Sequence, residues 1–328
     1  MDLNQFDIKA KNNELYESLI KFKIPVIEKD KIIKNKLEVI GEGTFGKVYA
    51  GKYGNIDVAI KKLKLSPTAD LDDILAEINS CTKISHPQIP KFYGVWKTEK
   101  YLHLIFDYIK GSNLKVWRQN NSNASLKEIM NIVIQIVEIM DGVHSQNVIH
   151  RDLKPENIML MNGKVYIIDF GVSKISIHTQ TGTNVARGTP KYFGPENCCS
   201  NDYDDIEEKE DNQEELENKE ISQKLYTISN KYDIWSIGCI ISYLVSGHHP
   251  WSKKGKAKDK NGKNIMENTP DIIVIQLLNR KTKFPLPKEI PDALKDILKL
   301  CFVYNPPDRI SAGNLLIELK KYMETIKE

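Results

Sequence analysis

Two runs rich in β-branched and aromatic residues, at positions 48–53 and 56–60, are separated by the pair Gly54-Asn55. Such runs favour strands, and a short turn pair between them favours a β-hairpin. A third apolar run, at positions 101–109, predicts a further strand. The hydrophobic pattern therefore predicts a β-rich region in the first third of the chain.

Two other segments carry apolar residues at helical spacing. Ile74, Ile78 and Cys81 recur every three or four positions and predict a helix over residues 71–81. A longer pattern predicts a helix over residues 126–146, and the chain that follows is predicted to be mainly helical.

The first 36 residues are rich in Lys and Asn. Within them, Leu15, Leu19, Ile20 and Phe22 are predicted to share one face of a short helix. This segment either packs on the back of the β-rich region or serves as a regulatory or docking arm.

Three glycines, Gly41, Gly43 and Gly46, precede the hairpin in the spacing GxGxxG. Dinucleotide-binding folds use the same spacing for a strand-to-helix turn, but here the glycines lead into a hairpin. A backbone without side chains can close over phosphate groups, and Lys61, in the second strand of the hairpin, would add a positive charge for them. The region is therefore predicted to bind a nucleotide.

A short segment in the middle of the chain carries carboxylates and an amide at a spacing suited to phosphoryl transfer. Residues 150–157 read His-Arg-Asp-Leu-Lys-Pro-Glu-Asn, and residues 168–171 read Ile-Asp-Phe-Gly. Asp152 would accept or orient the proton of an attacking hydroxyl, while Asn157 and Asp169 would hold magnesium ions. One carboxylate and one amide suffice, because Mg²⁺ prefers oxygen ligands and keeps several waters. Either segment alone is common in loops without a catalytic role, but the two together predict phosphoryl transfer.

In this order the motifs resemble those of the eukaryotic protein kinase superfamily, and the turn into the lysine strand is similar to that of its tyrosine-kinase-like group. The resemblance covers about residues 37–318. It implies an α+β class and a bilobal protein kinase fold over residues 37–325, after an N-terminal extension of residues 1–36. The small, mainly β N-lobe with one key helix would span residues 37–109, and the larger, mainly α C-lobe would span residues 110–325.

The resemblance implies ATP and Mg²⁺ as cofactors. Lys61 would pair with Glu77 in the predicted helix, Phe106 would stand at the back of the adenine pocket, and the backbone from Asp107 to Ile109 would face the adenine. The residues expected to contact the nucleotide are Ile40, Gly41, Glu42, Gly43, Thr44, Phe45, Gly46, Val48, Ala59, Lys61, Asp107, Ile109 and Met159. The expected catalytic residues are Asp152, Lys154, Asn157, Asp169, Lys61 and Glu77, of which Asn157 and Asp169 are the metal ligands.

Residues 172–196 resemble the activation segment, which ends in Gly194-Pro195-Glu196 where the family usually has Ala-Pro-Glu. Loss of the alanine methyl group is expected to be tolerated. Glu196 is expected to pair with Arg309.

Regulation by phosphorylation is a further expectation from the resemblance. Arg151 would pair with a phosphate on the activation segment. Thr183 is the preferred acceptor over Thr179 and Thr181, although all three threonines can equally be polar loop residues.

Lys154 and Thr189 match the serine/threonine type, so the expected substrates are Ser and Thr hydroxyls of proteins, with dual specificity left open. A pseudokinase scaffold is the rival from another class, but every catalytic group is present. A small-molecule kinase on a related fold is a third alternative, disfavoured by the activation segment and by Arg309. Cys81 departs from the pattern, since the family usually has Leu there.

Two strongly charged insertions interrupt the C-terminal half. Residues 202–220 hold eleven acidic residues against two lysines, and residues 253–263 hold six lysines against one aspartate. Neither has the apolar content to fold alone. They are either solvated loops or surfaces that attract each other or select a charged partner.

Composition narrows the remaining function classes. A net charge of +3 over 328 residues is too small to imply a nucleic-acid partner, and no apolar run approaches a membrane span. The five cysteines do not have the number and spacing of a disulfide framework. Cys81, Cys239 and Cys301 are predicted to be core thiols. Cys198 and Cys199 are adjacent, but no further Cys or His lies at the spacing that a metal site needs. We expect a cytoplasmic protein, and the sequence leaves its oligomeric state open.

Overall fold

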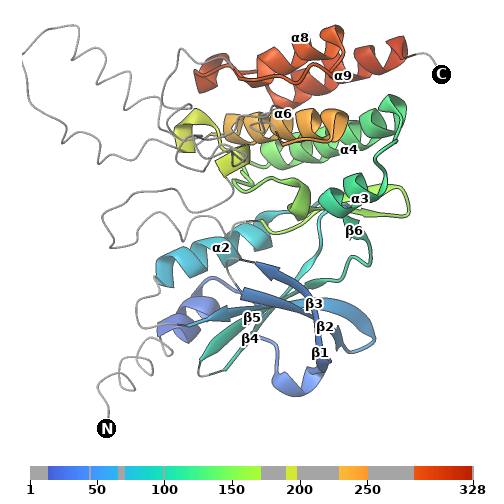
Figure 1. Cartoon of the computed structure of the whole chain (residues 1–328). Coiled ribbons are helices and arrows are strands. Elements are labelled where there is room, and N and C mark those ends of the chain that lie inside the picture. The colour runs from blue at the N-terminus through green and yellow to red at the C-terminus, as the bar shows by residue number, and fades with distance from the viewer. Residues whose placement is uncertain are drawn as a thin grey trace, which may run out of the picture. The chain divides into compact units, whose positions relative to one another are not determined.

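The computed structural model describes residues 14–43, 46–65, 71–98, 100–170, 190–197, 229–249 and 284–326 (Figure 1). The chain divides into two units, each considered by itself: Met1–Ser112 with Ile158–Ile175, and Asn113–Asn157 with Ser176–Glu328. Several predicted features lie outside the described residues: Thr44, Phe45, the activation segment up to Thr189 with Thr179, Thr181 and Thr183, Cys198, Cys199 and both charged insertions.

The first unit is built on a five-stranded antiparallel sheet in the order β1-β2-β3-β5-β4. The strands are β1 (Ile32–Gly43), β2 (Gly46–Tyr53), β3 (Ile56–Lys64), β4 (Phe92–Lys97) and β5 (Tyr101–Asp107). Tyr53 pairs with Ile56 across the Gly54-Asn55 turn, so the predicted hairpin is confirmed. The predicted strand at residues 101–109 is confirmed as β5 and ends two residues earlier.

The same unit contains the helix α2 (Leu71–Lys83), the 3-10 turn η1 (Lys29–Lys31) and a second hairpin. This hairpin joins β7 (Ile158–Met161) to β8 (Lys164–Ile167) in antiparallel register. α2 confirms the helix predicted from the spacing of Ile74, Ile78 and Cys81. Its apolar face lies in a cluster with residues of β3, β4 and β5, which covers one face of the sheet.

Residues 14–21 are helical, as the apolar spacing predicts. Leu15 and Leu19 are 0% exposed, whereas Ile20 is 59% and Phe22 47% exposed. The prediction that all four share one face of the helix is therefore wrong for Ile20 and Phe22. Successive helical residues are about 100° apart, so Ile20 turns away when Leu19 faces inward, and Phe22 lies beyond the last helical residue.

The second unit is mainly helical. Its helices are α3 (Leu114–Asn120), α4 (Leu126–Ser145), α6 (Lys231–Ser246), α8 (Asp292–Cys301) and α9 (Ala312–Thr325). Short elements complete the described part: η2 (Pro155–Asn157), η4 (Pro190–Tyr192), η5 (Pro195–Asn197) and η7 (Pro306–Asp308). The two-residue strand β6 (Ser112–Asn113) lies where the chain passes from the first unit to the second. With a β-rich first unit and a helical second unit, the predicted α+β class is confirmed.

α4 is the long helix predicted over residues 126–146. It begins with a reciprocal capping box between Ser125 and Glu128, which satisfies backbone amides at the helix start. α4 packs against α6 and α9. Nearly every side chain of α6 is buried, so this helix forms the centre of the unit.

The three predicted core thiols are confirmed, since Cys81, Cys239 and Cys301 are buried and free of disulfide bonds. Burial raises the pKa of Cys239 well above its usual range and that of Cys301 to about 12. Both therefore stay protonated and act as apolar core residues at neutral pH.

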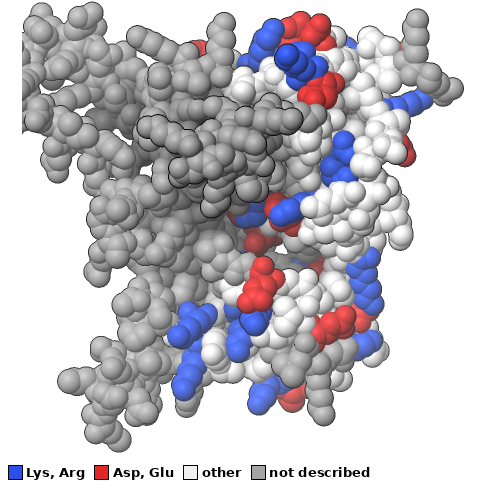
Figure 2. Space-filling view, in the orientation of Figure 1, with Lys and Arg blue, Asp and Glu red and all other residues white. Residues whose placement is uncertain are grey.

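On the face shown in Figure 2, Lys and Arg side chains are interspersed with Asp and Glu over the described residues. None of the helices in the described part of the chain has the length and apolarity to cross a membrane.

Candidate functional site

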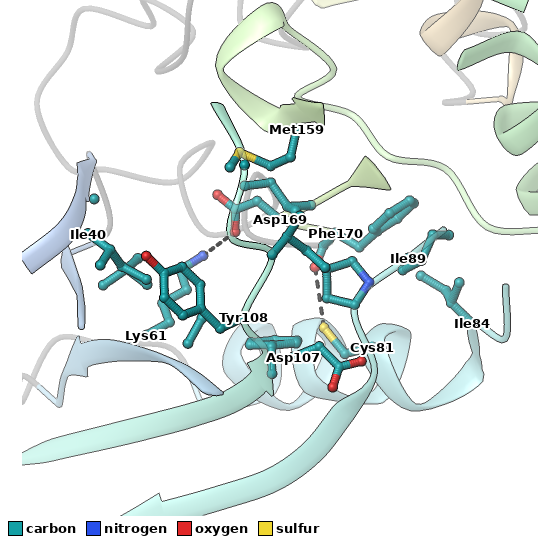
Figure 3. A pocket seen from close by; sticks show the side chains of 18 residues that line it. Ile40, Lys61, Cys81, Ile84, Ile89, Asp107, Tyr108, Met159, Asp169 and Phe170 are labelled. Atoms are coloured by element: carbon teal, nitrogen blue, oxygen red, sulfur yellow. Dashed lines mark hydrogen bonds and ion pairs between the residues drawn. The ribbon is translucent and has the colours of Figure 1, made fainter. Parts of the chain in front are cut away.

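A pocket of about 230 Å³ lies within the first unit, between the sheet, α2 and the residues that follow β8 (Figure 3). Eight predicted nucleotide-contacting residues line it: Ile40, Gly41, Val48, Ala59, Lys61, Asp107, Ile109 and Met159. Phe106 also lines it, as expected. Glu42, Gly43 and Gly46 lie in β1 and β2 without lining the pocket.

The alternation of β3 explains which of its side chains reach the pocket. Ala59 and Lys61 line it, whereas their neighbours Val58 and Ile60 are fully buried in a hydrophobic cluster. Successive side chains of a strand point to opposite faces, so one strand supplies both the site and the core.

Gly46 has a positive φ of 134° at the start of β2. A Cβ atom there would overlap the carbonyl oxygen of Lys62 in the neighbouring strand. The backbone geometry therefore requires a glycine at position 46, whether or not a ligand is bound.

Lys61 is buried, and its ammonium group forms an ion pair and hydrogen bond with the Asp169 carboxylate (dashed in Figure 3). A positive charge and a carboxylate therefore meet at one end of the pocket. Glu77 lies in α2, but its side chain is outside the described residues, so its pairing with Lys61 remains a prediction.

Cys81 links α2 to the segment after Asp169. Its thiol donates a hydrogen bond of 3.4 Å to the Phe170 carbonyl oxygen, and both residues line the pocket (Figure 3). The sequence predicted the burial of this thiol but not the bond, because no sequence pattern indicates which carbonyl a buried thiol faces. The family's usual leucine could not make this bond.

Asp107, the last residue of β5 and part of the pocket lining, is fixed by two donors. The Lys91 amide donates to one carboxylate oxygen at 2.9 Å, and the Tyr93 hydroxyl donates to the other at 2.7 Å. Burial, followed by the bond to Asp107, raises the pKa of Tyr93 to about 12, which keeps the hydroxyl protonated as the donor. Tyr93 has no place in the sequence motifs.

The predicted catalytic loop lies in the second unit. Lys154 pairs with Asp152 at 2.6 Å between Nζ and Oδ2, and the Asn157 amide nitrogen lies 3.1 Å from the same oxygen. This nitrogen also donates to the Asp152 carbonyl at 2.8 Å. The three predicted residues are therefore brought together around one carboxylate.

The residues present fit magnesium by the chemistry of their donors. The amide nitrogen of Asn157 faces Asp152, so its amide oxygen is directed elsewhere and can serve as an uncharged ligand. Asp169 supplies a carboxylate, and both are the oxygen donors that Mg²⁺ prefers. Asn157 and Asp169 belong to different units. The described residues contain no group of three or more His, Cys, Asp or Glu that could hold a metal ion by itself.

Asp233, in α6, orders the backbone that leads into the catalytic loop. Its carboxylate accepts the amides of His150 and Arg151, both at 2.9 Å, and lies 2.9 Å from Nε2 of His144. Arg151 has a φ of 69°, a conformation that a non-glycine residue rarely adopts. The buried carboxylate therefore holds the turn just before Asp152. No role was predicted for Asp233, because the amides that it binds are more than 80 residues away in the sequence.

The expected pair of Glu196 and Arg309 is confirmed. The two side chains form a two-pronged ion pair with distances of 2.6 and 3.0 Å, and both are almost completely buried. Arg309 also donates to the carbonyl oxygens of Val303 and Lys231. The pair ties η5 to the segment after η7.

We predict that Gly194→Ala, which introduces the family's usual residue, destabilises this chain. A Cβ atom at Gly194 would lie 2.7 Å from Oε2 of Glu196, and Arg309 holds that carboxylate in place. The expected loss is about 1–3 kcal/mol of unfolding free energy, the usual cost of overpacking, measured by urea denaturation. Gly41→Ala is the stability control, because its added methyl would meet nothing closer than 3.7 Å. Equal stability of the two variants would contradict the prediction.

Comparison with known proteins agrees with this geometry. The family model described as protein kinase domain matches residues 34–211 and 218–319. A probable serine/threonine-protein kinase of Dictyostelium discoideum is 26% identical over 292 residues, covering 87% of this chain and 54% of that protein. The serine/threonine-protein kinase SSK22 of Saccharomyces cerevisiae is 26% identical over 310 residues, covering 86% of this chain and 20% of that protein.

A third relative is mitogen-activated protein kinase kinase kinase 3 of Arabidopsis thaliana, 24% identical over 296 residues, with 86% of this chain and 39% of that protein covered. The chain thus spans about half or less of the length of these curated relatives. The match to the family model covers most of the chain and includes both Lys61 and Asp152. The chain belongs to the protein kinase family and is similar to its serine/threonine members.

Proposed function

We propose that this chain is an ATP-dependent protein kinase that transfers the γ-phosphate of ATP to serine and threonine hydroxyls of proteins in intracellular signalling. The observation that carries the proposal is the pocket of the first unit, where Lys61 meets Asp169 beside the strand that ends at Asp107. This arrangement supports a nucleotide with its phosphates toward Lys61 and a magnesium ion at Asp169.

The choice of Ser and Thr as acceptors rests on Lys154. Its ammonium group lies 2.6 Å from the Asp152 carboxylate, where it can steady a transferring phosphate while Asp152 orients the hydroxyl. The names of the relatives support the same substrate class.

Radiolabelled ATP, magnesium and generic protein substrates, followed by phosphoamino-acid analysis, test the proposal. Label on serine and threonine is the expected result, and label on tyrosine as well would indicate dual specificity. Absence of label together with retained nucleotide binding would favour a pseudokinase scaffold and contradict the proposal.

A further inference from the structure

Residues 14–27 precede the part of the chain that the family model matches, which begins at residue 34. Leu15, Leu19 and Ile24 from this segment are nevertheless buried in the hydrophobic cluster that contains the apolar face of α2. The α2 members of that cluster are Ile74, Leu75 and Ile78. In Figure 1 the short dark-blue helix near the N-terminus is the helical part of this segment.

The segment is also fixed through its backbone. The Ile27 amide donates to the Val95 carbonyl oxygen at 2.7 Å, and the Val95 amide donates to the Pro25 carbonyl oxygen at 2.8 Å. Gly94 makes this approach possible, because it has a φ of 141° and a Cβ atom there would overlap the Pro25 carbonyl. Buried leucines and paired amides are features of an integral part of a domain, and a detachable docking arm would expose both.

α2 connects this segment to the pocket. Cys81 lies three residues after Ile78, so it continues the apolar stripe toward the end of α2. Its thiol bonds to the Phe170 carbonyl, and the preceding residue, Asp169, pairs with Lys61. A displacement of α2 therefore shifts the backbone that carries the carboxylate partner of Lys61.

We infer that residues 14–27 form an N-terminal brace, which positions α2 and, through Cys81, the Asp169 carboxylate beside Lys61. The inference rests on the proposed function, because the positioned groups are those assigned to the nucleotide. It adds residues outside the family's domain to the determinants of activity.

Leu19→Ala tests the inference, with Leu19→Met as the conservative rescue. The neighbouring variant Ile20→Ala is the matched surface control. Val58→Ala is the stability control, since Val58 is fully buried in another cluster of the same unit, which contains Ile27 from the end of the brace but no residue of α2. Activity is measured with MgATP and a generic protein substrate, at a temperature where circular dichroism shows each variant folded. Leu19→Val replaces Leu19→Ala if the latter does not fold.

We expect Leu19→Ala to lower kcat roughly tenfold, which is in the usual range for coupling between distant sites. Leu19→Met should keep most of the wild-type kcat. Amides of α2 and of Phe170 should exchange hydrogen faster in Leu19→Ala than in either control. Wild-type kcat in a folded Leu19→Ala variant, or an equal loss in Val58→Ala, would overturn the inference.

Hydrogen exchange separates this inference from the proposed function. A wild-type chain without phosphoryl transfer would contradict the proposed function. Faster exchange at the Phe170 amide in Leu19→Ala, and in neither control, would still support the brace. Unchanged exchange at Phe170 in an active protein would contradict the brace alone.

Discussion

Asp152→Asn is expected to remove phosphoryl transfer while leaving the fold intact. The carboxylate of Asp152 receives the Lys154 ammonium at 2.6 Å and the Asn157 amide nitrogen at 3.1 Å, both on Oδ2. An asparagine keeps an oxygen acceptor for both donors but loses the charge that attracts the proton of a hydroxyl. Loss of a general base lowers kcat by about 10² to 10⁴-fold, measured by incorporation of labelled phosphate under saturating ATP.

Asp292→Asn is the matched control for the loss of an ion pair. Asp292 pairs with Lys295 at 2.9 Å on the exposed surface of α8, and its side chain is 95% exposed. This variant should keep wild-type kcat, because exposed pairs contribute little. Asp152→Asn with more than half of the wild-type kcat would exclude Asp152 as the base. Equal unfolding midpoints for all three proteins would confirm that the loss is chemical.

The sequence predicted the site residues that lie in short linear motifs. Ala59 and Lys61 both reach the pocket because alternate side chains of a strand point to the same face. The local hairpin turn fixes the register of this strand with its neighbour. Asp152, Lys154 and Asn157 are close in sequence, so a single loop brings them together. The placement of these side chains could therefore be predicted from the sequence alone.

Contacts between residues distant in sequence were harder to predict. The Cys81 thiol and the Phe170 carbonyl are 89 residues apart, and the Asp233 carboxylate and the His150 amide are 83 apart. Which groups meet over such distances depends on the packing of whole elements. The exposure of Ile20 beside the buried Leu19 was missed for the related reason that helical spacing does not give the direction of the buried face. The Glu196–Arg309 pair was anticipated only because the family resemblance supplied it.

Arg309→Met is expected to cause a large loss of stability in the second unit. The Glu196 side chain is 3% exposed, and removal of the guanidinium leaves its carboxylate buried without its charged partner. The carbonyl oxygens of Val303 and Lys231 also lose a donor. Breaking a buried ion pair by removing one partner costs about 3–5 kcal/mol, a large fraction of the ~5–15 kcal/mol that stabilises a typical domain.

Urea unfolding followed by tryptophan fluorescence measures this loss, because the Arg309 guanidinium lies 5.1 Å from the ring of Trp235. The double variant Arg309→Met with Glu196→Gln should regain part of the lost stability, since no unpaired charge then remains buried. Lys295→Met, which breaks the exposed pair with Asp292, should cost less than about 1 kcal/mol. If Arg309→Met costs no more than Lys295→Met, the buried pair does not stabilise the segment that ends at Glu196. A double variant less stable than Arg309→Met alone would show instead that Glu196 is stabilised by groups other than Arg309.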